Sequence, residues 1–143
     1  MPTNNLIGGK ASFALGLVLK ENTRLKVLKL AMNRIDDQNG ARIIKMIAKN
    51  NYLEELDLST NEIGPEFVES SKESLKFNNT LKQLNISYTN VEIDKEIIKI
   101  AEAHPNLVIM AVRHSKTPEA LFLQLESILT KKKIQLEYGS KFR

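Results

Sequence analysis

The sequence predicts an α/β solenoid of about four stacked repeats, each made of a short strand, a turn and a helix. Two observations carry this prediction. Leucines recur in a fixed arrangement at intervals of 28 residues (25 to 53, and 53 to 81) and then 26 residues (81 to 107). Apolar stretches with helical spacing lie between these segments, as at 43–47 and 97–101. Because one such unit cannot bury its apolar face alone, stacked neighbours form a continuous core.

The leucine segments share one motif. Residues 25–35 carry leucine at the first, fourth and sixth places, asparagine at the ninth and isoleucine at the eleventh, and residues 53–63 repeat this arrangement. Degenerate copies follow at 81–91 and 107–113. The pattern L-x-x-L-x-L-x-x-N-x-I resembles the leucine-rich repeat family, in particular its long, 28-residue subclass typified by ribonuclease inhibitor. The resemblance implies a right-handed solenoid with a parallel β-sheet on its concave side and helices on its convex side.

The fourth and sixth places of each motif are predicted to point into the core, since side chains alternate along a strand. The stacked positions are Leu28 and Leu30, then Leu56 and Leu58, then Leu84 and Ile86. Parallel pairing is expected because each strand connects to the next through a helix.

The asparagines at the ninth place, Asn33 and Asn61, fall where the chain turns out of its strand. We interpret them as structural, because a buried amide can satisfy backbone groups that have no partner in the sheet. Replacing Asn61 by alanine is predicted to cost about 1–3 kcal/mol of stability.

The chain is predicted to form a single leucine-rich repeat domain over residues 1–143. Residues 1–24 form a partial first repeat without its strand, because Asn5 already holds the ninth place of the motif. Full repeats follow at 25–52, 53–80 and 81–106, then a last repeat with a capping helix at 107–133, and a short strand or tail at 134–143. Either the chain is a fragment, or another chain covers the open apolar edge.

The capping helix is expected to begin at Thr117-Pro118-Glu119, which offers a hydroxyl cap, a proline at the first helical position and an acid in the first turn. Lysines 131–133 are expected to end it, and alternation at 134–138 predicts a fifth strand. The lysines either contact an acidic partner or simply favour the negative end of the helix dipole.

Composition excludes several classes of protein. Lys plus Arg is 21 and Asp plus Glu is 17, giving a net charge of +4, and 42% of residues are hydrophobic. The absence of cysteine excludes disulfides and thiolate metal sites. The sequence contains no run of about 20 apolar residues that would predict a membrane span. The N-terminus also lacks a signal-peptide pattern, so a cytoplasmic protein is expected.

No catalytic motif is found, so we expect neither enzymatic activity nor a cofactor or metal. The two histidines, His104 and His114, lack an evident partner carboxylate. His104 stands where the other repeats carry Asn22, Asn50 and Asn78, which favours a role in a turn. His114 follows the last well-marked strand, near the concave edge, and of the two histidines it is the candidate site residue.

The strand residues that point away from the core are the candidate partner-binding residues. They form three columns across the repeats: Val27, Glu55, Gln83 and Ile109; Lys29, Asp57, Asn85 and Ala111; Ala31, Ser59, Ser87 and Arg113. The resemblance implies that such a surface binds a partner, and the alternative is an ordinary solvated sheet face.

The expected function is protein–protein interaction, as a module or assembly scaffold in a larger complex, through the concave face or the open N-terminal edge. The alternatives are a regulator of a GTPase or of actin assembly, as in the Ran GTPase-activating proteins and the tropomodulins, or a pathogen effector. The expected partner is another protein. The lysines lack an aromatic platform, which argues against nucleic acid.

Overall fold

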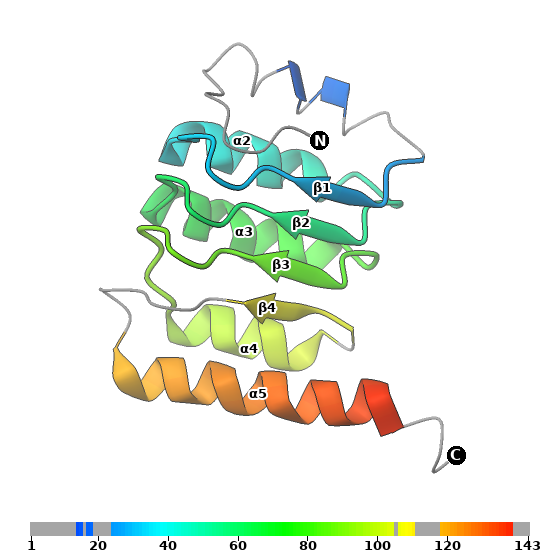
Figure 1. The fold of residues 1–143 in the computed structure, drawn as a ribbon, viewed down its shortest axis with the longest axis vertical. Coiled ribbons are helices and arrows are strands. Elements are labelled where there is room, and N and C mark those ends of the chain that lie inside the picture. The colour runs from blue at the N-terminus through cyan, green and yellow to red at the C-terminus, as the bar shows by residue number, and fades with distance from the viewer. Residues whose placement is uncertain (1–13, 16, 19–23, 105, 111–117, 139–143) are drawn as a thin grey trace.

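The computed structural model of the chain describes residues 14–15, 17–18, 24–104, 106–110 and 118–138. Strands and helices alternate along the chain (Figure 1). The strands are β1 (Val27–Lys29), β2 (Glu55–Asp57), β3 (Gln83–Asn85) and β4 (Val108–Met110). The helices are α2 (Asp37–Ile47), α3 (Pro65–Phe77), α4 (Lys95–Ala103) and α5 (Glu119–Tyr138).

The strands form one parallel sheet in chain order, β1-β2-β3-β4, with a layer of helices behind it (Figure 1). The predicted α/β solenoid with a parallel sheet is therefore confirmed. Leu28 pairs with Leu56, and Leu56 with Leu84, so the 28-residue period of the sequence is the register of the sheet.

The last strand departs from the predicted register. Leu84 pairs with Ile109, and Ile109 is buried, with 3% of its surface exposed. The prediction that Ile109 lies beside Gln83 on the concave face is therefore wrong. β4 starts four positions after His104, whereas β3 starts five positions after Asn78 (104 to 108, and 78 to 83). One residue fewer turns every side chain of a strand to the other face.

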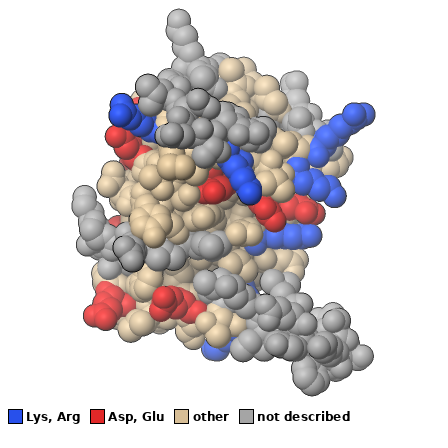
Figure 2. Space-filling view, viewed as in Figure 1, with Lys and Arg blue, Asp and Glu red and all other residues tan. Residues whose placement is uncertain are grey.

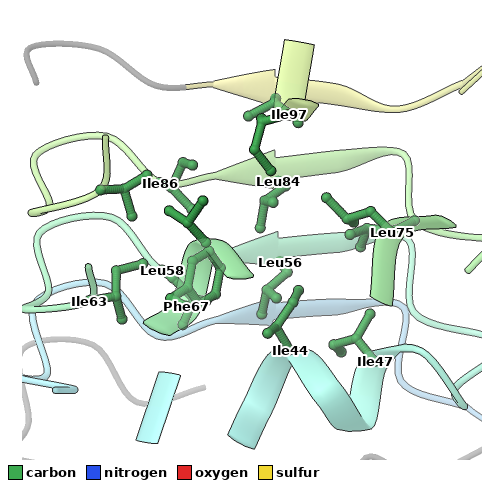
Figure 3. Close-up of a cluster of buried hydrophobic side chains, with 14 of the residues drawn as sticks. Ile44, Ile47, Leu56, Leu58, Ile63, Phe67, Leu75, Leu84, Ile86 and Ile97 are labelled. Atoms are coloured by element: carbon green, nitrogen blue, oxygen red, sulfur yellow. The ribbon is translucent and has the colours of Figure 1, made fainter. Parts of the chain in front are cut away.

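The core lies between the sheet and the helices (Figure 3). The predicted inward residues are at most 3% exposed: Leu28, Leu30, Leu56, Leu58, Leu84 and Ile86. They meet side chains of the helices, among them Ile44, Ile47, Phe67, Leu75 and Ile97. Each fully buried side chain of this size contributes about 1.5–3 kcal/mol relative to an exposed one, so the leucine stacking stabilises the repeats.

Aspartates fix where the helices begin. Asp36 caps α2 by accepting from the backbone N–H of Asn39 at 2.8 Å, and Asp94 caps α4 in the same way. The start of α3 has no capping side chain of its own. Instead Asp37, in the first turn of α2, accepts from the backbone of Gly64, Glu66 and Phe67 at 2.7–2.8 Å. A carboxylate of one repeat thus caps the helix of the next.

The C-terminal segment also differs from expectation. The predicted end at lysines 131–133 and the predicted strand at 134–138 are wrong, because α5 runs without a break over 20 residues to Tyr138. The segment 119–138 contains neither glycine nor proline, so nothing in it stops a helix that is already formed. Leu125 of α5 is 4% exposed and joins the core.

Residues 14–15 and 17–18 of the predicted first repeat are helical, and Leu15 packs against the core. The rest of that repeat before residue 24, including its predicted open edge, lies outside the described residues. Within the part of the chain that the structure describes, no helix is both long and apolar enough to cross a membrane.

Candidate partner-binding surface

The sheet face turned away from the helices carries the first two predicted columns. Its residues are Val27, Lys29, Glu55, Asp57, Gln83 and Asn85, and together they are called the open sheet face below. All six line a shallow hollow of about 150 Å³ over the sheet. Figure 2 views the molecule from the strand side and shows basic and acidic side chains gathered together there.

The open sheet face offers mixed chemistry on a rigid support. Val27 and Glu55 are exposed register partners, and Lys29 is aligned with Asp57 on the adjacent strand. The side chain of Asp57 is held in place, because its Oδ1 accepts from the backbone N–H of Ser59 at 2.9 Å. Asn85 accepts from the N–H of Ser87 in the same way at 3.1 Å. A partner would therefore meet side chains that are already oriented.

The third predicted column is less accessible than the other two. Ala31 and Ser59 are half-buried, and Ser87 is only 5% exposed. In the last repeat, Val108 and Met110 hold the register places of Gln83 and Asn85. Ala111 and Arg113 lie outside the described residues.

Three further residues border the open sheet face. Met32, Thr60 and Tyr88 follow the strands at 28-residue intervals, and each has a left-handed backbone, with φ of 58°, 55° and 57°. This conformation is uncommon for residues other than glycine, and it turns the chain out of the sheet. Met32 is 45% exposed and Tyr88 53% exposed. We call this row the strand-end rim.

The repeat fixes the positions of the strand-end rim but not its conformation. Residues 32, 60 and 88 occupy the eighth place of the motif, an x position whose residue type varies. Neither the type nor the spacing of these residues reveals a left-handed backbone. Methionine and aromatic side chains are enriched in protein interfaces, so an exposed Met32 and Tyr88 suit partner contact.

The asparagines of the motif are structural, as predicted. Asn61 is 5% exposed, and its Oδ1 accepts from the backbone N–H groups of Asn33 and Ile35, both at 3.0 Å. Its Nδ2 donates to three carbonyl oxygens, those of Leu30, Leu58 and Ser59. Asn61 therefore joins two neighbouring repeats where the strand hydrogen bonds end.

A second row of polar side chains joins the repeats at the opposite end of the helices. Asn50 accepts from the backbone N–H of Leu53 at 2.7 Å, and in the next repeat Asn78 accepts from the backbone N–H of Leu81 at 2.8 Å. Asn78 also donates through Nδ2 to the carbonyl of Asn50 at 2.9 Å. His104 takes the next place, where its Nδ1 accepts from Leu107 N–H at 3.0 Å. The predicted turn role of His104 is thereby confirmed.

Because its Nδ1 accepts, the proton of His104 is on Nε2, which donates to the carbonyl of Asn78 at 3.1 Å. His114 lies outside the described residues. No group of three or more His, Asp or Glu side chains positioned to hold a metal ion occurs in the described ranges.

Lys132 completes this second row. It is 8% exposed, and its Nζ donates to the carbonyl oxygens of Ala101, His104 and Leu107, the contact to His104 being 2.8 Å. The first of these carbonyls belongs to the last turn of α4. The expectation that the lysine cluster ends its own helix is therefore corrected: Lys132 caps α4, while Lys131 is exposed.

Comparisons with known proteins agree with this architecture. A family model described as a leucine-rich repeat matches residues 49–66. A protein from Caenorhabditis elegans, described as a homolog of protein phosphatase 1 regulatory subunit 37, is 31% identical over 84 residues. That alignment covers 59% of this chain and 9% of the relative, so the chain corresponds to a small part of that protein's length.

Solved structures with the same fold are actin-binding site 2 of leiomodin-1 and the C-terminal domain of Caenorhabditis elegans tropomodulin. The first has a TM-score of 0.76 at 20% identity, covering 99% of this chain and 86% of that one. The second has a TM-score of 0.60 at 11% identity, covering 92% and 99%. At these identities the likeness concerns the fold.

Proposed function

Since this chain belongs to the leucine-rich repeat family, we propose that it is a protein-interaction module that binds its partner on the open sheet face. The observation that carries the proposal is the row of outward side chains that the 28-residue register aligns across β1, β2 and β3. Their backbone is fixed by stacking, so binding costs little ordering entropy.

The chemistry of this surface favours a partner of mixed character. Lys29 attracts a carboxylate, whereas Glu55 and Asp57 attract a lysine or an arginine. Met32 and Tyr88 on the strand-end rim supply apolar area beside these charges, which is the usual composition of a binding hot spot and its surroundings. No step of this mechanism requires a cofactor.

Actin is the first partner to test. One of the solved structures that share this fold is by its title an actin-binding site, that of leiomodin-1. A role in a larger complex through another protein, including one that covers the N-terminal edge, is the second candidate. It is supported by the relative that is named a phosphatase regulatory subunit.

The proposal is tested by reversing charge on the open sheet face. The double variant E55K/D57K is compared with E73K/E102K, which reverses two exposed acids on α3 and α4. Each variant is used to capture proteins from the native source and to bind purified actin filaments in a pelleting assay. We expect at least one partner to be retained by the parent and by E73K/E102K, and to bind E55K/D57K at least tenfold more weakly.

Tyr88→Ala serves as an uncharged second variant, because E55K/D57K also removes the Asp57–Ser59 hydrogen bond. Melting curves confirm that each variant is folded. If every retained partner binds all of the variants equally well, the open sheet face is not the binding surface. If the parent protein does not pellet with actin filaments but another partner is lost from E55K/D57K, actin is rejected as the partner and the open sheet face is retained as the binding surface.

A further inference from the structure

A groove separates α3 and α4 on the helix side of the molecule, away from the open sheet face. Its volume is about 1070 Å³. Leu75, Ile100 and Ala103 provide its apolar lining. The hollow between α2 and α3 is about 340 Å³, so the third and fourth helices leave a much larger space than the second and third.

The groove lies between two attachments that hold α4 to α3. At the start of α4, Lys72 of α3 pairs with Asp94 at 2.6 Å and with Glu96 at 3.3 Å. At the end of α4, His104 bonds to the carbonyl of Asn78. These contacts fix the walls of the groove, so it is part of the folded structure.

The first attachment is a cluster of ion pairs around Lys72. The hydrogen bonds that Lys72 donates to the carboxylates of Asp94 and Glu69 raise its pKa above its ordinary value, so the lysine stays charged. Lys72 is itself mostly covered, with 12% of its side chain exposed. Lys72 is thus shared by three carboxylates, those of Glu69, Asp94 and Glu96, and Glu96 is also paired with Lys76 at 3.4 Å.

Two cations on α4 are left without such partners. Lys95 and Lys99 line the groove, are exposed, and lie four residues apart on one side of the helix. Neither belongs to an ion pair found among the described residues. The charged side chains that line the groove are those of Lys76, Lys95, Lys99 and Glu96, so its border carries more positive than negative charge beside an apolar lining.

We infer that the groove between α3 and α4 binds an acidic, amphipathic segment of a partner protein. Apolar side chains of that segment pack over Ile100 and Ala103, and its carboxylates face Lys95 and Lys99. Recognition of a segment in an apolar groove with charged borders is a common mode of peptide binding. Nucleic acid is the less suitable ligand, because the described residues that line the groove include no Phe, Tyr or Trp, and its one ring, that of His104, is held by hydrogen bonds to Asn78 and Leu107.

The test is selection of peptides by the full chain from a phage-displayed library of random sequences. We expect enriched peptides in which aspartate or glutamate flanks apolar residues. Synthetic copies of these peptides should bind K95E/K99E about tenfold more weakly than the parent, and A103W, which fills the groove, should weaken binding to a similar extent.

K45E/K49E is the matched control, because it reverses two exposed lysines with the same spacing at the end of α2. Its affinity should stay within about twofold of the parent. Loss of binding to the same extent in K45E/K49E would indicate general charge attraction and overturn the inference. The inference is also overturned if no acidic peptides are enriched, or if K95E/K99E binds the peptides as tightly as the parent does. Competition for the groove by a single-stranded oligonucleotide, or a change in oligomeric state caused by K95E/K99E, would overturn it as well. None of these results depends on the open sheet face.

Discussion

The regular turns of the solenoid and its last turn satisfy the same backbone groups with different side chains. In the regular turns, Asn61 makes five hydrogen bonds, three of which cross to the preceding repeat. In the third motif, Thr89 holds the equivalent place and bonds only within its own turn, to Ile86 and Val91. At the other end of the helices, Asn50 and Asn78 give way to His104 and then to Lys132.

This difference shows that the repeat selects hydrogen-bonding capacity at these positions. An amide both donates and accepts, as does an imidazole with one N–H, so Asn78 and His104 make equivalent contacts in successive repeats: each donates to the carbonyl of the residue one repeat earlier and accepts from the N–H three residues later. An ammonium only donates, and Lys132 accordingly contacts only carbonyl oxygens. The predictions below test this comparison, from the largest expected effect to the smallest.

The largest effect is expected in the last strand. Ile109→Ala removes a core side chain and should lower the free energy of unfolding by about 2–5 kcal/mol, whereas Val108→Ala on the opposite face should cost less than about 1 kcal/mol. Urea unfolding of the two variants measures both values. A larger loss for Val108→Ala than for Ile109→Ala would contradict the observed register and favour the 26-residue spacing that the sequence predicted.

Asn61→Ala is expected to cost about 3 kcal/mol, at the upper end of the range for an unpaired buried group, because both of its amide atoms bond across repeats. Thr89→Ala should cost only about 1 kcal/mol. Equilibrium unfolding compares them, with Asn61→Thr as the control that copies the third repeat. A melting curve of Asn61→Ala equal to that of the parent contradicts its structural role.

Lys132→Met leaves three carbonyl oxygens without their donor and should cost about 1–2 kcal/mol, against less than about 0.5 kcal/mol for exposed Lys131→Met. Burial lowers the pKa of Lys132 below its ordinary value of 10.5. The unfolded chain then holds this proton more tightly, so the advantage of the parent over Lys132→Met should grow as the pH rises toward 10.5. Denaturant titrations at several pH values measure the trend, and equal losses in both lysine variants would reject the capping role.

The smallest effect concerns Lys72→Met, with a cost below about 1 kcal/mol because its acidic partners are largely exposed. Burial alone would raise the pKa of Asp94, but Lys72 and the N–H of Ile97 together hold it below its ordinary value of 3.8. The resulting stabilisation is present above pH 3.8 and is lost as the pH falls through the lower pKa of the folded state. Acid unfolding curves of the parent and of Lys72→Met should therefore converge at low pH, and a gap that persists there contradicts this origin.

Much of the fold could be predicted from the sequence because the buried positions recur at regular intervals along the chain. The alternation of Leu28, Leu30 and their counterparts identifies the strands, the core face and the parallel register. The position of Ile109 could not be predicted, since the motif does not reveal a residue missing between a turn and a strand. The helix over 134–138 was missed because five alternating residues suit either structure.

Part of the candidate site could also be predicted, again from the alternation of side chains along the strands. The outward columns on β1, β2 and β3 follow directly from strand alternation. The contacts of Asp37 and Lys132 join residues 25–31 apart, and no local pattern distinguishes these side chains from solvated surface charges. The left-handed backbone at Tyr88 likewise depends on how the chain leaves the sheet.

The central claim is that the open sheet face binds the partner. It is tested most directly by placing a photo-crosslinking amino acid at Glu55, on that face, or at Glu73 on α3, and illuminating each protein in an extract of the native source. The account predicts a discrete crosslinked product from position 55 that is absent from position 73. A product from position 73 alone would place the binding surface on the helices and contradict the account.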